Sequence, residues 1–233
     1  MANVKILGIV GSPRHRSNTE VMVSEALSGA EEAGKVETDI LLLAGKKINP
    51  CNSCFKCKER NDLCIFRFKD GMQEVYEKYL SADGLILGSP VYHLSVSGLL
   101  KNAIDRLGQG IISKYRETGL PWFCKVGGVL TQGVASFGGQ EYTTQFLVGH
   151  LMIMNNIVVP PDGINALGVS GSFREAPTRE PGVIGEYDPE ALSRSRILGR
   201  RVAEITRIVK AGVETLKNDL PEEYTRNVIE RRG

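Results

Sequence analysis

Short apolar runs alternate with amphipathic stretches along most of the chain. Five of the runs have the length of strands buried on both faces of a sheet: Val4–Val10, Val36–Leu43, Gly84–Gly88, Lys125–Thr131 and Asn156–Val159. Stretches with helical periodicity lie between them: Asn18 or Thr19 to about Gly34, Asp70 to about Tyr79, Ser95–Leu107 and Gly139–Met154. Because strand–helix–strand crossovers are right-handed, this α/β alternation predicts a doubly wound parallel sheet with helices on both faces.

Two stretches interrupt the alternation. Gln109–Pro121 precedes the fourth strand, and Pro160–Tyr187 is a long segment with little periodicity. Segments of that length are typical of lids, partner contacts or disorder. A last helix is expected to begin at Asp188-Pro189-Glu190, with an aspartate cap and a first-turn proline, and to run to about Lys217. The charged residues 219–233 are expected to dock on a partner subunit or to fray.

The composition is that of an ordinary soluble globular protein. The chain has 233 residues, of which 42% are hydrophobic and 24% charged, and its net charge is +2. So small a charge gives no indication of nucleic acid or of an anionic membrane as a partner. No apolar run is long enough to span a bilayer, and the first residues resemble a strand rather than a signal peptide. We therefore expect a cytoplasmic protein.

Four of the five cysteines lie within fourteen residues, as Cys51, Cys54, Cys57 and Cys64. Thiolates at this spacing suit an iron–sulfur cluster or a tetrahedral zinc ion. The C-x2-C-x2-C run favours iron–sulfur, because zinc sites usually combine two separate pairs of ligands, but zinc stays open. Disulfides in so short a loop would need a secreted protein. The fifth cysteine, Cys124, is more typical of a packed thiol.

The loops after the first, third and fourth strands carry the second candidate site. The commoner strand order for five strands, 2-1-3-4-5, places these loops around a ligand at the carboxyl ends of the strands. The first loop, Gly11–Thr19, is rich in hydroxyls, carries two arginines and ends at a helix N-terminus, where amides and the helix dipole favour an anion. It lacks the glycine patterns of dinucleotide and nucleoside-triphosphate loops. It predicts the site of one terminal monophosphate, such as that of FMN; a helix cap without a ligand is the alternative.

The third and fourth loops would surround a flat ring. The third loop supplies apolar and aromatic surface: Pro90, Val91, Tyr92 and His93. A core tyrosine and a surface histidine are the plain alternatives for the last two. The fourth loop is rich in glycine, which lets backbone approach a ligand closely, and begins with Thr131, Gln132 and Gly133. The case rests on all three loops lying where the topology puts a ligand.

These motifs resemble a known family. Gly-Ser-Pro-Arg-x-x-Ser-Asn-Thr after the first strand and Gly-Ser-Pro-Val-Tyr after the third are similar to the flavodoxin-like NAD(P)H-dependent FMN reductase superfamily. With the four cysteines, the chain resembles the iron–sulfur flavoproteins over about residues 4–159. By motif position, five residues would hold the FMN phosphate: Ser12, Arg14, Ser17, Asn18 and Thr19. Four would line the isoalloxazine: Pro90, Val91, Tyr92 and His93.

The resemblance also implies cofactors and assembly. It implies FMN in each subunit, a 4Fe–4S cluster on the four cysteines, and a homodimer or homotetramer in which one subunit's cluster lies near a neighbour's flavin. Residues 1–159 would form the flavodoxin-like FMN-binding domain, including the cluster loop 45–69. Residues 160–233 would form an irregular segment and a C-terminal helix packed on that domain or on a partner subunit.

The expected function is that of a flavin-dependent redox enzyme. It would exchange electrons with a ferredoxin-like or NAD(P)H donor and reduce a small acceptor such as oxygen, peroxide or a quinone-like compound. One alternative is an NAD(P)H-dependent FMN or quinone reductase whose cysteines hold zinc or nothing. Another is a pure electron carrier with no substrate of its own. The histidines offer little for a metal site or a hydrolytic triad, and His150, in an apolar helix, is expected to be a core residue.

Overall fold

The computed structural model describes residues 3–64, 69–117, 125–163, 165–173 and 183–224. Its strands are β1 (Val4–Val10), β2 (Val36–Leu42), β3 (Gly84–Pro90), β4 (Val126–Gly133), β5 (Ile157–Val158) and β6 (Val169–Ser172). Its helices are α1 (Asn18–Glu32), α2 (Lys56–Arg60), α3 (Met72–Ser81), α4 (Gly98–Lys114), α5 (Gln140–Ile153), α6 (Ile184–Tyr187) and α7 (Pro189–Thr215). The α/β alternation expected from the sequence is confirmed.

The strands form one parallel sheet in the order β2-β1-β3-β4-β5, as expected. Parallel pairing brings the carboxyl ends of β1, β3 and β4 to one edge, with Val10 opposite Gly88 and Gly88 opposite Leu130. The strand order reverses direction between β1 and β3, and this switch point is where doubly wound sheets hold ligands.

The fifth position in the sheet is filled by two short strands. β5 pairs with the start of β4, at Val126 and Gly127, and β6 pairs with its end, at Leu130–Gly133. Because β3 occupies the other edge of β4, both strands lie on the same side of it. The expectation that residues 160–187 form one irregular segment is therefore wrong in part, since that segment contains β6 and α6.

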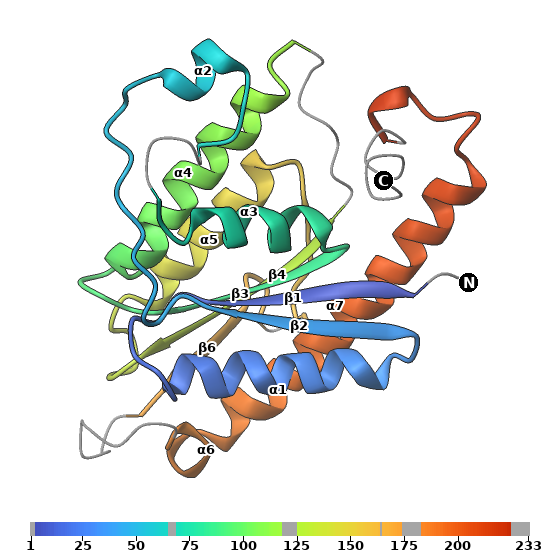
Figure 1. The fold of residues 1–233 in the computed structure, drawn as a ribbon. Coiled ribbons are helices and arrows are strands. Elements are labelled where there is room, and N and C mark those ends of the chain that lie inside the picture. The colour runs from blue at the N-terminus through green and yellow to red at the C-terminus, as the bar shows by residue number, and fades with distance from the viewer. Residues whose placement is uncertain (1–2, 65–68, 118–124, 164, 174–182, 225–233) are drawn as a thin grey trace.

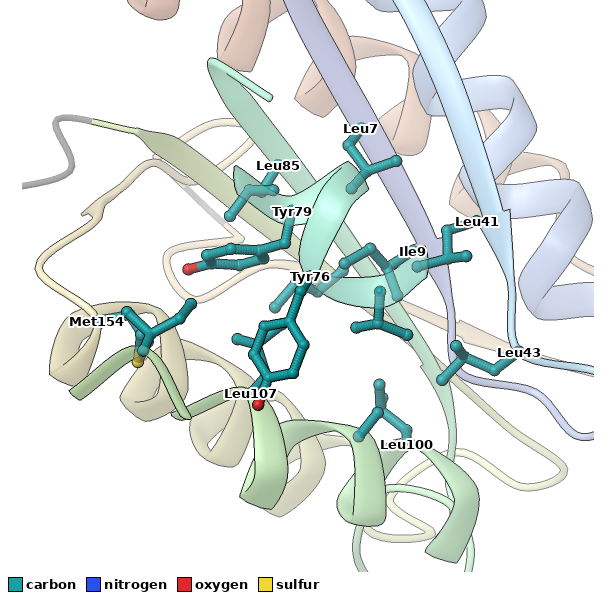
Figure 2. Close-up of a cluster of buried hydrophobic side chains, with 14 of the residues drawn as sticks. Leu7, Ile9, Leu41, Leu43, Tyr76, Tyr79, Leu85, Leu100, Leu107 and Met154 are labelled. Carbon is teal, nitrogen blue, oxygen red and sulfur yellow. The ribbon is translucent and has the colours of Figure 1, made fainter. Parts of the chain in front are cut away.

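Helices cover both faces of the sheet (Figure 1). Helices α3, α4 and α5 lie on one face, and α1 and α7 lie on the other. Figure 2 shows the first core, in which Tyr76 and Tyr79 of α3 fill the space between Leu7 of β1 and Leu107 of α4. The second core joins β1, β3 and β4 to α1 and α7.

The packing of α7 on α1 depends on a glycine. A Cβ built on Gly199 would lie 1.6 Å from the carbonyl oxygen of Ala26, so a larger residue would force the helices apart. The expected cap of α7 is confirmed, since Oδ1 of Asp188 accepts a hydrogen bond from the amide of Ala191 at 3.0 Å. Helix α1 is capped by Ser17 rather than by Asn18 or Thr19, one residue earlier than expected. No helix in the described part of the chain is long and apolar enough to cross a membrane.

Candidate functional site

The loops after β1, β3 and β4 enclose a cavity with about 540 Å³ of empty space. Ten of the twelve residues expected at the flavin site line it: Ser12, Arg14, Ser17, Asn18, Thr19, Pro90, Val91, Tyr92, Gln132 and Gly133. The structure thus brings three loops, widely separated in the sequence, to one cavity. Their roles as ligands of a cofactor stay a prediction.

The first loop is held in shape by its own hydroxyls. Oγ of Ser12 accepts a hydrogen bond from the amide of Arg14 at 3.1 Å, which tightens the turn. Oγ of Ser17 accepts from the amide of Glu20 at 3.2 Å and caps α1. Ser17, Asn18 and Thr19 line the cavity, so the N-terminus of α1 and the positive end of its dipole lie at it, an arrangement that stabilises an anion.

Thr19 tests whether these residues fit a bound phosphate. Its side chain is fully buried and lines the cavity, yet its Oγ1 has no hydrogen-bond partner among the described residues. A buried hydroxyl without a partner costs about 1–3 kcal/mol. A phosphate oxygen bound in this cavity would give that hydroxyl an acceptor, so the residues present fit the phosphate of FMN.

The third and fourth loops are tied to each other at the cavity. The amide of Val91 donates to the carbonyl oxygen of Gln132 at 2.8 Å, and Tyr92 and Ser95 exchange two backbone hydrogen bonds that close a tight turn. This turn holds an apolar rim in place without a bound ring.

Two of the expected residues do not line the cavity. His93 is exposed and has a φ of 48°, and Thr131 is fully buried, with its hydroxyl near those of Thr144 and Ser170. Val134 and Phe173 line the cavity and were not expected. Phe173 directly follows β6, the strand that sequence patterns did not indicate. Val134 is one residue past the predicted Thr131–Gly133 group and was within reach of the glycine-rich signal.

The four clustered cysteines line a second cavity, with about 970 Å³ of empty space. Cys51 is exposed, Cys54 and Cys57 are half-buried and Cys64 is buried. The loop turns sharply, because Ser53, Phe55 and Asn61 all have positive φ, which is uncommon for residues other than glycine. Backbone of this kind is often found at functional sites.

The four cysteines line this cavity, but their side chains do not converge on one common centre. In the described part of the chain, no group of three or more histidine, cysteine or acidic side chains is gathered closely enough to hold a metal ion. A tetrahedral zinc site holds its sulfurs about 3.8 Å apart, given a zinc–sulfur distance of about 2.3 Å. A 4Fe–4S cluster places its four thiolates on four separate irons and so needs a wider ring of sulfurs. The four cysteines that line one cavity are a donor set that fits such a cluster.

A buried arginine on α4 lies beside these thiols. Arg106 lines the cysteine cavity, and Nη2 of its guanidinium donates to the carbonyl oxygen of Cys64 at 2.6 Å. Nη1 lies 2.5 Å from Oδ2 of Asp70, and neither side chain is exposed by more than 1%. Sequence analysis missed Arg106. The signal was a charged residue within the apolar stripe formed by Ala103 and Leu107.

The charges here shift several pKa values. Burial raises the pKa of the Cys64 thiol, and the guanidinium of Arg106 opposes that shift by hydrogen bonding and by its charge. Burial alone would raise the pKa of Asp70, but hydrogen bonds from Arg106 and Asn49 outweigh it, so the pKa lies below its usual value. Asp70 is therefore ionised at neutral pH, and the ion pair carries both charges.

Helix α4 connects the two cavities. Its N-cap Ser97 donates a hydrogen bond to the carbonyl oxygen of Gly11 in the first loop, and its amide donates to Oγ of Ser89 at 3.4 Å. Arg106 follows nine residues later, which is about 14 Å along the helix axis. One rigid element thus fixes the distance between the flavin cavity and the cysteine cavity within a chain.

The expectation that His150 is a core residue is confirmed. His150 is 8% exposed, and burial lowers its pKa to about 4, with the charge of Asp105 opposing the shift. Asp105 itself forms an i,i+4 ion pair with Lys101 at 2.6 Å. Cys124 lies outside the described residues.

Comparison with known proteins agrees with this geometry. The model of the NADPH-dependent FMN reductase family matches residues 4–170. An iron–sulfur flavoprotein of Methanocaldococcus jannaschii is 37% identical over 211 residues, which cover 89% of this chain and 100% of that protein. An iron–sulfur flavoprotein of Methanosarcina thermophila is 36% identical over 156 residues, covering 67% of this chain and 77% of that protein.

Solved structures agree on the fold. The chain is similar to RosB, crystallised with the bound intermediate 8-demethyl-8-formylriboflavin-5'-phosphate, with a TM-score of 0.63 and 15% identity over 94% of this chain and 88% of that one. The resemblance inferred from the two loop motifs and the cysteines is thereby confirmed. The chain belongs to the NADPH-dependent FMN reductase family and, within it, to the iron–sulfur flavoproteins, and it is a flavin-dependent oxidoreductase.

Proposed function

We propose that each subunit binds FMN in the cavity of the first, third and fourth loops and a 4Fe–4S cluster on Cys51, Cys54, Cys57 and Cys64. Electrons would pass between a ferredoxin-like or NAD(P)H donor and a small acceptor such as oxygen, peroxide or a quinone-like compound. The observation that carries the proposal is that all four cysteines line one cavity. That cavity is also lined by α4, the helix whose N-cap contacts the first loop of the flavin cavity. The curated relatives named above are iron–sulfur flavoproteins, which supports the same pair of cofactors.

The protein's own residues would bind and orient these groups. The hydroxyls of Ser12 and Thr19 and the amides at the start of α1 would hold the phosphate. Val91 and Tyr92 would shield one part of the ring from water. A bound flavin accepts two electrons and can release them singly, whereas the cluster carries one at a time. This pairing suits a protein that converts between one-electron and two-electron carriers.

Reduction kinetics test the choice of donor. Under anaerobic conditions, NADH, NADPH and a reduced ferredoxin would each be mixed with the holoprotein while the flavin and cluster absorbances are followed. Reduction by ferredoxin, with reoxidation by peroxide or a quinone at a matching rate, is the expected result. Reduction by NADPH alone, with zinc in the cysteine cavity, would instead support a simple FMN or quinone reductase. Reduction without turnover of any acceptor would support a pure electron carrier.

We also propose that the protein is a homodimer or homotetramer in which the cluster of one subunit serves the flavin of another. Apolar side chains in the loop between β4 and α5 are exposed: Val134, which lines the flavin cavity, at 55% and Phe137 at 92%. A subunit interface would cover them. Sedimentation at several protein concentrations, combined with stopped-flow reduction, tests this assembly. Cluster-to-flavin electron transfer at an undiminished rate in a stable monomer would contradict it.

A further inference from the structure

The guanidinium of Arg106 joins the two ends of the cysteine segment. Nη1 contacts the carbonyl oxygen of Asn49 at 3.3 Å and the carboxylate of Asp70 at 2.5 Å, while Nη2 donates to the carbonyl oxygen of Cys64 at 2.6 Å. Asn49 lies two residues before Cys51, and Asp70 lies six residues after Cys64. One planar group therefore fixes where the segment leaves the core and where it returns.

The surroundings hold Arg106 itself in place. The hydroxyl of Tyr76 donates to the backbone carbonyl of Arg106, and both side chains are buried. A Cβ on Gly110, one turn further along α4, would lie 2.1 Å from that hydroxyl, so the helix can approach α3 only with glycine there. Figure 2 shows Tyr76 pointing from α3 toward α4. The guanidinium is thus fixed before any metal group is bound.

The position of the charge matters as much as the hydrogen bonds. Arg106 lines the cysteine cavity, whereas its counter-ion Asp70 does not. Lys58 and Asp105 also line this cavity and contribute one charge of each sign. The charge of Arg106 therefore leaves a net positive potential at the cavity, and because its side chain is buried, water screens that charge less than it would at the surface. Four thiolates and a cluster together carry negative charge, and each added electron increases it.

We propose that Arg106 is a positioning residue that sets the reduction potential of the cluster bound by the four cysteines, with Asp70 as the opposing charge. The inference rests on the proposed cluster and goes beyond it by assigning its regulation to two residues that are not ligands. Arg106 makes the cluster easier to reduce, and Asp70 limits that effect. Neither residue gains or loses a proton when the cluster accepts its electron.

A redox titration of the holoprotein tests the two residues by the sign of their effects. The full chain is prepared anaerobically, its iron and sulfide are measured, and the cluster is titrated with dithionite while its electron paramagnetic resonance signal is followed separately from the flavin. Arg106→Met removes the charge but keeps the length of the side chain. It is expected to lower the equilibrium constant for one-electron reduction at least tenfold, which is about 59 mV for a one-electron couple. Asp70→Asn is expected to shift the constant in the opposite direction.

Two further variants separate charge from structure. Arg106→Lys keeps the charge and should restore the constant to within about threefold of the wild type, by the same charge argument. Lys125→Met removes another fully buried cation, which contacts the carbonyl oxygens of Leu80 and Ala82 and not the cysteine cavity. It should destabilise the protein without changing the constant. This control shows what loss of a buried charge does when it lies away from the thiols.

The outcomes distinguish this inference from the proposed function. Arg106→Met and Asp70→Asn shifting in the same direction, or neither shifting in iron-loaded protein, would overturn the role of Arg106 while leaving the cluster in place. If Arg106→Met holds no iron, Asp70→Asn still decides, because it keeps Arg106 in place and removes only the opposing charge. Wild-type protein without iron would contradict the proposed cluster first, and this inference with it.

Discussion

The amide of Ile184 donates a hydrogen bond to Oδ1 of Asn18 at 3.1 Å, across 166 residues of sequence. Asn18 is the first residue of α1 and lines the flavin cavity, and Ile184 begins α6. This hydrogen bond uses the carboxamide oxygen of Asn18, which is an acceptor. The carboxamide NH₂ group of the same side chain is a donor, which is what a phosphate requires. The segment that follows β6 therefore helps to orient a residue of the phosphate loop.

Replacing Asn18 by aspartate separates these two roles. Asn18→Asp keeps the size of the side chain and an acceptor for Ile184, but it exchanges the NH₂ donor for a negative charge. A hydrogen bond to a charged group contributes about 1.5–3 kcal/mol, so FMN affinity should fall at least about tenfold. Titration of the apoprotein with FMN, followed by quenching of flavin fluorescence, gives the affinity.

Riboflavin and Asn18→Ala serve as controls for that experiment. Riboflavin lacks the phosphate, so Asn18→Asp should change its weak binding much less than it changes FMN binding. Asn18→Ala loses both roles and should lower thermal stability as well as FMN affinity. Equal loss of affinity for riboflavin and FMN would contradict a phosphate role for Asn18.

The buried hydroxyl of Thr19 predicts opposite effects of its removal on apoprotein stability and on FMN affinity. Thr19→Val keeps the shape of the side chain and removes Oγ1, which has no partner among the described residues. The apoprotein should gain about 1 kcal/mol of unfolding free energy, because an unsatisfied buried group is lost, while FMN binds about tenfold more weakly. Urea unfolding of the apoprotein and FMN titration measure the two effects.

Thr143 offers a matched control for Thr19. Its hydroxyl is also buried but donates to the carbonyl oxygen of Gly139 at 2.9 Å, so Thr143→Val should destabilise the apoprotein. If Thr19→Val destabilises the apoprotein as Thr143→Val does, then Oγ1 of Thr19 already has a partner and the argument for a phosphate there fails.

The cysteine cavity and the flavin cavity should be separable by mutation. Cys54→Ala or Cys57→Ala is expected to remove the broad visible absorbance of an iron–sulfur cluster and to leave FMN bound, because the two cavities share no lining residue. Cys124→Ala, which changes the one cysteine outside the group of four in the sequence, is the control and should leave both cofactors. Loss of iron in the Cys124 variant alone would show that the ligand set is assigned wrongly.

The free energy of unfolding should fall in mild acid because His150 is buried. Burial lowers its pKa to about 4 from 6.5, so between these values the unfolded chain binds a proton there that the folded chain does not. The stability that comes from keeping His150 neutral is fully present above pH 6.5, and it is lost as the pH falls toward 4. At pH 5 the loss should be about 2 kcal/mol relative to pH 8.

Urea unfolding of wild type and His150→Gln at the two pH values isolates that contribution. The variant should show a smaller difference in unfolding free energy between pH 8 and pH 5 than the wild type does. An unchanged pH dependence in His150→Gln would mean that another group titrates in this range.

Sequence patterns predicted an element correctly where the residues that define it are contiguous in the chain. The apolar run Val4–Val10 has the same bounds as β1, and the cap at Asp188 was recognised from three residues. The strand order was predicted as the commoner one for a doubly wound sheet of five strands. Ten of the residues expected at the flavin cavity lie together because that topology alone brings the three loops to one edge.

What the sequence did not indicate depends on contacts between distant residues. β6 is only four residues long, with glycine and serine in it, and it exists because β4 offers a free edge. Helix α4 continues into the stretch from Gln109 that was expected to be an insertion, since Gly110 packs tightly against Tyr76 and so belongs in the helix. The ion pair of Arg106 and Asp70 joins residues 36 apart, which no local pattern shows.

The content of bound cofactors tests the central claim most directly. The wild-type protein is purified anaerobically, its visible spectrum is recorded, and FMN, iron, acid-labile sulfide and zinc are measured per chain. We expect one FMN and about four iron and four sulfide per chain, the content of one 4Fe–4S cluster held by four cysteines. FMN together with stoichiometric zinc and no iron would contradict the claim.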